Sequence, residues 1–222
     1  LGIGAWRGIP GIRGLDGDVA ASDDAGRVSV RSAGLRFELT RFLAGPVGAN
    51  DVGATFDWWW RPDGWRIATD GVRVVAPAGR AGGKARLWLP SRADESPRLV
   101  LDLDVADVDA RGVIEYLPLR RFPPRTVQWL REGIRAGRVP KAKLEYAGAT
   151  RRFPFRDGGG LFRVRADFAG IRLHYQDGWA DLEGAGGEVE FRNEGFTARA
   201  TAGRVAGLAL ERAAARMTDY RD

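Results

Sequence analysis

The stretch Phe56–Trp65 reads FDWWWRPDGW, with three adjacent tryptophans, a Pro-Asp-Gly segment and a fourth tryptophan. Side chains alternate between the two faces of a β-strand, so every second residue from Phe56 to Trp60 points to the same side. Asp-Gly between two such runs is a strong hairpin signal. A tight turn at Asp63 and Gly64 puts Trp65 and Ile67 on the face of Trp58. The segment therefore predicts a hairpin with a wide aromatic face and a charged back, on which Trp59 lies among charges.

The same alternation of apolar and polar residues recurs along the chain, and glycines separate the runs at hairpin-like intervals. This pattern predicts a mainly β protein, an antiparallel meander of about a dozen strands with one apolar and one charged face. The apolar face must be covered, either by a second sheet or by a ligand. Runs outside the tryptophan hairpin are RVSV (28 and 30), LRFEL (35, 37, 39), ARLWL (87, 89), RLVLDLDV (99–105), LFRVRADF (162–168), IRLHY (171–175), EVEF (189, 191) and FTARA (196–200).

One segment, FPPRTVQWLREGIRAGRVP, departs from this alternation. Two prolines suit the first turn of a helix, and Gly137 suits its C-terminal cap. Val127, Leu130 and Ile134 form an apolar stripe, so we expect one amphipathic helix near residues 123–136. The expected organisation is a single unit with a first β-meander at 1–110, a helix-containing connection at 111–145 and a second β-meander at 146–222.

Positive charge is concentrated in the middle of the chain. Residues 120–156 contain eleven basic and two acidic side chains, a net charge of +9, whereas the whole chain carries +6. Phosphate is the natural partner of such a patch, in a lipid headgroup or in nucleic acid. A solvated surface without a ligand is the alternative. Most aromatic residues lie outside the patch, which argues against a stacking platform for single-stranded nucleic acid.

The sequence lacks the residues that several functional classes require. The 222-residue chain has no cysteine and one histidine, His174, which the pattern places as a solvent-facing strand residue. No nucleophile–histidine–acid arrangement is indicated, and the spacing of Asp102, Asp104 and the acids after them lacks the glycine and closing glutamate of a calcium loop. We expect neither an enzyme nor a cofactor-binding protein. No apolar run approaches the roughly 20 residues of a membrane helix, and the first residue, Leu1, suggests a fragment of a longer protein.

The order of several short motifs resembles the YhdP family of AsmA-like proteins of Gram-negative bacteria. The resemblance is strongest from about Val113 to Leu210 and rests on YLP, a proline-bearing helix start, WLREGIRAGRV, FPF at 153–155, a glycine turn, F-x-V-x-A, L-x-Y and EFRNEGFTARATAGRVAG. The upstream W-R-x-D-G-W hairpin and L-x-L-P at 87–90 agree with it. One departure is Trp179-Ala180, where the family pattern has Trp-Pro.

The resemblance implies an elongated, curved sheet, a half-tube with an apolar inner surface. It also implies the periplasmic portion of a protein that is anchored in the inner membrane outside this fragment. Such proteins conduct phospholipids toward the outer membrane, with which they connect indirectly, and no catalytic residues carry over. We expect phospholipid acyl chains as the partner, no nucleic acid and a monomer.

These expectations define the candidate site residues and the competing hypotheses. The second hypothesis is a structural β module whose core is closed by its own helix and a second sheet, and the third is a nucleic-acid binder that uses the basic patch. Candidate headgroup contacts are Arg131, Arg135, Arg138, Lys141 and Lys143. Candidate groove-lining residues are Phe56, Trp58, Trp60, Trp65, Ile67, Leu101, Leu103, Phe162, Val164, Phe168, Leu173, Tyr175 and Phe191.

Overall fold

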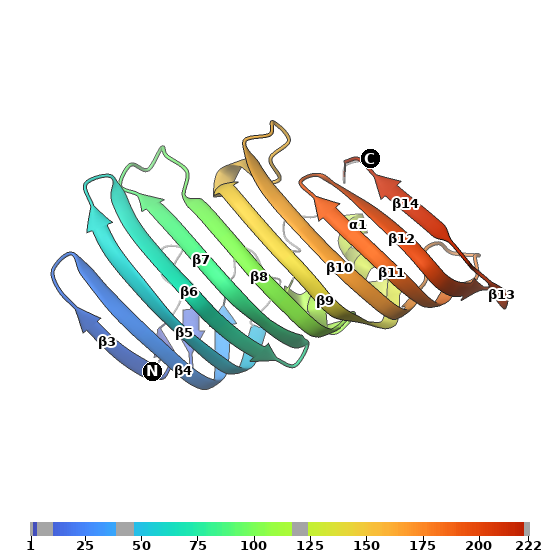
Figure 1. Cartoon of the computed structure of the whole chain (residues 1–222), viewed down its shortest axis with the longest axis horizontal. Coiled ribbons are helices and arrows are strands. Elements are labelled where there is room, and N and C mark those ends of the chain that lie inside the picture. The colour runs from blue at the N-terminus through green and yellow to red at the C-terminus, as the bar shows by residue number, and fades with distance from the viewer. Residues whose placement is uncertain (1, 4–10, 39–46, 117–123, 220–222) are drawn as a thin grey trace.

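The computed structural model describes residues 2–3, 11–38, 47–116 and 124–219, and its strands join one antiparallel sheet (Figure 1). Twelve strands follow one path across the sheet, and two more pair beside it. From β4 to β12 each strand pairs with the next one in the chain, as expected for a meander. The sheet is open and does not close into a barrel, so the predicted mainly β, half-tube fold is confirmed.

The described residues contain fourteen strands and three helical segments. The helical segments are the 3-10 helix η1 (Gly112–Tyr116), the α-helix α1 (Pro124–Gly133) and the 3-10 helix η3 (Thr150–Arg152). The strands are β1 (Gly2–Ile3), β2 (Gly11–Arg13), β3 (Gly17–Ala21), β4 (Ala25–Glu38), β5 (Val47–Arg61), β6 (Gly64–Ala76), β7 (Gly79–Pro90), β8 (Arg98–Asp109), β9 (Ile134–Ala149), β10 (Gly160–Leu173), β11 (Leu182–Arg192), β12 (Gly195–Val205), β13 (Leu208–Ala209) and β14 (Ala213–Met217).

The tryptophan hairpin is formed by β5 and β6, with Pro62 and Asp63 in the turn. Trp60 is paired with Trp65, and Trp58 with Ile67, so the predicted shared face is confirmed. Gly64 opens β6 at a φ of 134°, and a Cβ atom there would lie 2.1 Å from the Leu89 carbonyl oxygen. The turn therefore lies one residue earlier than predicted, because the glycine is needed where β6 approaches β7.

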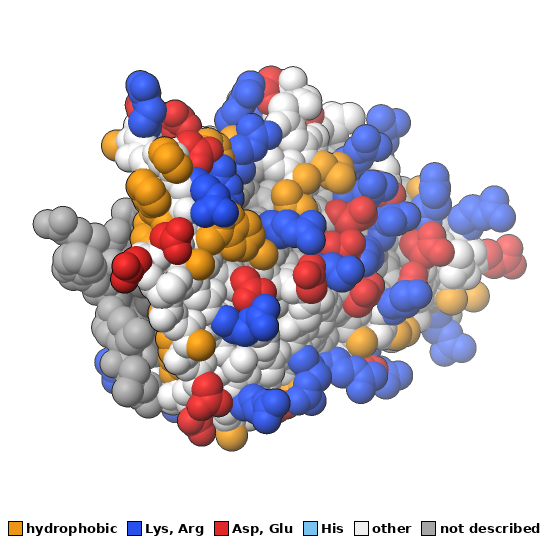
Figure 2. Space-filling model, turned by 60° about the vertical axis from the view of Figure 1, so that its left-hand side comes forward, with side chains coloured by type: hydrophobic (Ala, Val, Ile, Leu, Met, Phe, Trp, Pro, Cys, Tyr) orange, Lys and Arg blue, Asp and Glu red, His pale blue; other side chains and the backbone are white. Residues whose placement is uncertain are grey.

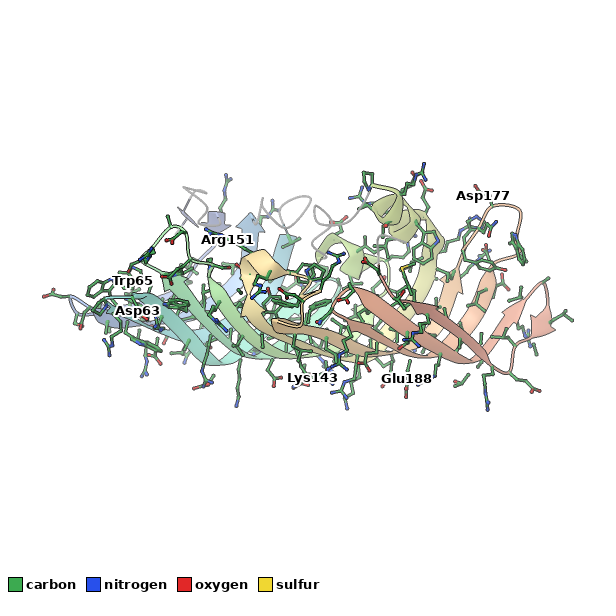
Figure 3. The ribbon with its side chains drawn as sticks, turned by 90° about the horizontal axis from the view of Figure 1, so that it is seen from above. Asp63, Trp65, Lys143, Arg151, Asp177 and Glu188 are labelled. Atoms are coloured by element: carbon green, nitrogen blue, oxygen red, sulfur yellow. The ribbon has the colours of Figure 1, made fainter. Side chains whose placement is uncertain are left out.

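The sheet is bent into a trough (Figure 3). Lys143 and Glu188 point away from its outer, convex side, whereas α1 lies on the inner, concave side. We call the end of the sheet that carries the β5–β6, β7–β8, β9–β10 and β11–β12 connections the hairpin rim. The opposite end, with α1 and residues 174–181, is the helix rim.

The predicted helix is present but shorter than residues 123–136. It ends at Gly133, and β9 begins at Ile134. Gly137, predicted as the helix cap, lies within β9 at a φ of 133°. A Cβ atom there would lie 2.8 Å from the Ile171 Cα atom, so this glycine permits close approach of β10 instead. Pro123, the expected start of the helix, lies outside the described residues.

A small closed core lies near the N-terminal end of the sheet. Val30, Leu35, Ala49 and Val52 are buried together, and Leu15 packs against them. Elsewhere the chain has much exposed surface. Its accessible area is 14263 Å², whereas a globular monomer of 24.2 kDa exposes about 10,000 Å². The excess is expected of an open sheet, and all strands of the described residues belong to this one sheet.

Candidate functional site

The register of the strands assembles a continuous apolar surface on the concave face. Residues that are directly paired across an antiparallel sheet project to the same side, so one row can be followed from strand to strand. One row runs through Trp58, Ile67, Leu87 and Leu99. Another runs through Leu103, Leu144, Val164, Phe191 and Phe196.

Eleven of the thirteen candidate lining residues lie on this face. Phe56 is paired with Val28, Leu101 with Tyr146, Phe162 with Tyr146 and Phe168 with Gly187. Leu173 lies at the end of β10, past two register shifts, and is paired with Leu182 and Ile134. Tyr175 lies beyond β10, and its ring contacts that of Trp179. Whether any of them contacts lipid stays a prediction.

The apolar surface is left uncovered at the hairpin rim of β5, β6 and β7. Trp60 and Trp65 are each 42% exposed and Leu89 is 36% exposed. They form one cross-strand row, in which Trp65 is paired with both of the others. An exposed aromatic row of this kind marks a place where a ligand or another surface can bind.

Farther along the same rim, the concave face is covered by the β9–β10 connection. Phe155 is 1% exposed, and its ring lies over two glycines, Gly148 and Gly160, that are paired across the strands. The ring also contacts that of Tyr146, with 5.2 Å between centroids. The FPF motif thus supplies a short segment that folds over the apolar face. The sequence indicated the motif but not its place.

The convex face carries alternating charges (Figure 2). Lys143 lies between Asp102 and Asp104 of β8, with 3.4 Å to an oxygen of Asp104. Its hydrogen bond to Asp102, more than that to Asp104, raises the pKa of Lys143. Glu145 lies 3.2 Å from Arg163 and 3.5 Å from Arg165. Across β8, β9 and β10, basic side chains therefore face acidic ones, so the described part of residues 120–156 does not form a uniformly positive surface.

The five candidate headgroup contacts are spread over three places. Arg131 is exposed on α1, and Arg135 at the start of β9 lies 3.2 Å from Asp181. Arg138 is paired with Asp109 across the sheet. Lys141 and Lys143 lie farther along β9, paired with Asp167 and Arg165 of β10. The structure does not bring the five together as one patch.

Trp59 belongs to a row on the convex face that sequence reasoning missed. It is paired with Arg66 of β6, which is in turn paired with Trp88 of β7. The Arg66 guanidinium lies 5.1 Å from the Trp88 ring centroid, within the range of a cation–π contact, and also binds Asp63 at 2.6 Å. Trp59 and Arg66 face each other across the predicted hairpin, but Trp88 joins the row only through the register of β6 with β7.

His174 lies just beyond β10 and is not the solvent-facing strand residue that was predicted. Its Nδ1 atom is 2.9 Å from Asp181 and its Nε2 atom is 3.0 Å from Asp177. These hydrogen bonds, that to Asp177 first, raise the pKa of His174. Asp181 also binds Arg172 at 2.9 Å. The cluster ties residues 174–181 to β9 and β10 at the helix rim, and Trp129 of α1 donates to the Tyr175 carbonyl at 3.3 Å.

Two further features to consider are a metal centre and a membrane-spanning helix. Within the ranges that the structure describes, no group of three or more histidine, cysteine or acidic side chains is placed to hold a metal ion. No helix among the same residues is long and apolar enough to cross a membrane. The candidate functional site is the concave face, because its paired strands carry continuous apolar rows and an exposed aromatic row.

Comparison with known sequences agrees with this geometry. The sequence model of the family described as "YhdP protein" matches residues 1–222. No curated protein and no solved structure matches the chain. Because the family match covers the whole sequence, the chain belongs to the YhdP family.

Proposed function

We propose that this chain is a segment of a conduit that carries phospholipids across the cell envelope, with their acyl chains on the concave face of the sheet. Membership of the YhdP family suggests lipid transport in the envelope, and an open β-sheet fits a groove. The observation that carries the proposal is the set of apolar rows that continue from strand to strand, opposite a charged convex face.

The apolar lining lowers the cost of moving a lipid through water. Burial of apolar surface contributes about 25 cal/mol per Å², or about 0.8 kcal/mol per methylene. An acyl chain of roughly sixteen carbons exposed to water therefore costs on the order of 10 kcal/mol. Aromatic and aliphatic rows offset most of that cost without specific hydrogen bonds, so a lipid can slide along them.

When the acyl chains lie in the trough, the polar headgroup stays outside it. The headgroup travels along the open side, where Arg131 and Arg138 near the helix rim can meet its phosphate. The protein acts by binding and not by catalysis, as a monomer in the periplasm between the inner and outer membranes.

The structural-module hypothesis has one observation in its favour. The Phe155 segment and α1 occupy part of the concave side, so the chain fills some of its own groove. The expected second sheet is not found among the described residues, because all their strands belong to one sheet. The nucleic-acid hypothesis loses support, because basic side chains of the central segment face acidic ones.

Two adjacent residues of β8 provide a matched test. Leu101 lies on the concave face, whereas Val100 lies on the convex face, is 49% exposed and is paired with Arg86. The full-length protein with Leu101→Asp should lose most of the lipid that co-purifies with it, measured by native mass spectrometry. Val100→Asp should keep the wild-type load. Equal loads in the two folded variants would contradict the conduit.

A further inference from the structure

The β9–β10 connection is held rigidly over the concave face. A Cβ atom added at Gly148 would lie 2.6 Å from the Phe155 ring, and one added at Gly160 would lie 2.4 Å from it. Any side chain at these two positions would clash with the ring, so only glycine leaves room for Phe155; we call this glycine pair the seat of the ring. Phe153 extends the cover to the next row, with 5.3 Å between its ring centroid and that of Phe162.

Three separate contacts tie this connection to its neighbours. Arg151 donates to the carbonyls of Ala93 and Asp94, at 3.1 and 3.2 Å, in the β7–β8 connection. Asn193, between β11 and β12, donates to the Phe155 carbonyl at 3.4 Å. Arg156 binds Asp219, beyond β14, at 3.0 Å. Because the ties reach elements on both sides, the connection is a fixed part of the rim and not a swinging lid.

The β9–β10 connection covers the hairpin-rim end of the concave face at β9 and β10. The apolar surface that it leaves, called the floor, is narrower there. The rows of Gly160 and Phe162 lie under the connection, and the apolar surface continues along β10 from Val164 to Phe168. The four residue-to-residue steps from Val164 to Phe168 span about 14 Å in an antiparallel strand. The floor then meets the helix rim, where a Cβ atom added at Gly133 of α1 would lie 3.7 Å from Leu173. At β5, β6 and β7 the corresponding hairpin-rim row is uncovered, so the restriction is local.

We propose that Phe155 and the connection that it anchors determine which lipids pass, by admitting lipids with two acyl chains and excluding those with four or more. This inference rests on the proposed function, since it assumes that acyl chains occupy the concave face. Two chains lying side by side fit the narrowed floor, and a wider bundle of chains meets the buried Phe155 segment on one side and α1 on the other. Selection thus depends on the width of the apolar part and not on headgroup chemistry.

The test compares two lipids that share headgroup chemistry. Phosphatidylglycerol has two acyl chains, and cardiolipin has four on two linked phosphatidyl groups. The full-length protein is incubated with vesicles that contain both, re-isolated, and its bound lipids are quantified by mass spectrometry. We expect wild-type protein to take up at least tenfold more phosphatidylglycerol per mole offered. Phe155→Ala should lower that ratio to threefold or less.

Two further variants keep the test decisive. Arg156→Gln removes only the tie to Asp219, so it loosens the connection and should lower the ratio less than Phe155→Ala does. The exposed Leu208→Ala should leave the ratio unchanged. A wild-type ratio near one, or a ratio unaffected by Phe155→Ala and Arg156→Gln, overturns the selection while leaving the conduit intact. No uptake of either lipid by wild-type protein overturns both.

Discussion

Replacing Phe155 with alanine should destabilise the protein strongly. Loss of a buried phenylalanine side chain costs about 3–5 kcal/mol in the free energy of unfolding, and the upper part of that range applies where the site cannot collapse. The ring rests on the backbone of Gly148 and Gly160, which has no side chains to fill the space. For a chain of this length, each kcal/mol lowers the melting temperature by about 2–4 °C. We expect a decrease of about 6–20 °C, measured by circular dichroism.

A double-mutant cycle with Gly160→Ala tests whether the loss of stability arises from the contact between the Phe155 ring and Gly160. The added methyl group would lie 2.4 Å from Phe155 Cδ1 and 2.8 Å from the Ala147 carbonyl oxygen. Such overpacking costs about 1–3 kcal/mol in the wild type. In the Phe155→Ala background the first clash disappears, so the double variant should be more stable than the sum of the single effects by at least about 0.5 kcal/mol. Strict additivity, or a loss below about 1 kcal/mol for Phe155→Ala, would refute the buried seat.

Three more predictions concern other parts of the sheet. Because the pKa of His174 is raised in the folded state, its contribution to stability is present below about pH 6.5 and is lost as pH rises through the folded pKa. His174→Gln should therefore flatten the loss of stability as pH rises above about 6.5, measured by urea unfolding at a series of pH values, and an unchanged slope would contradict the ion pairs. Arg66→Ala removes the cation over Trp88 and should cost about 0.5–1 kcal/mol in urea unfolding, with no change expected in lipid load. Gly26→Ala would place a methyl group 2.2 Å from the Trp58 ring, so it should shift tryptophan fluorescence and reduce co-purified lipid, whereas wild-type values in both would argue against that ring position.

The features that were predicted correctly are those decided by the local alternation of apolar and polar residues. Trp58 and Ile67 share a face because strand geometry and one turn decide their relation, and both are readable within a few residues. Gly137 was misread because its role depends on Ile171 of the next strand, and a helix cap and a close strand contact both favour glycine. The helix was predicted to extend to residue 136 because Gly137 was taken as its cap, whereas α1 ends at Gly133.

Features that depend on register between distant segments were not predictable. Lys143 faces Asp102 and Asp104 only because β8 and β9 pair across the connection that contains α1. Phe155 can cover the concave face only because two glycines from different strands, Gly148 and Gly160, are paired beneath its ring. Both the mixed charge of the convex face and the narrowing of the groove therefore become visible only in three dimensions.

The most direct test of the conduit is photo-crosslinking along Phe56–Trp60 in cells that express the full-length protein. A photoreactive phenylalanine analogue replaces each of the five residues in turn, and lipid adducts are scored by mass spectrometry. The strand register predicts adducts at 56, 58 and 60, on the concave face, and none at 57 or 59. Equal labelling at all five positions, or labelling confined to 57 and 59, would contradict the account.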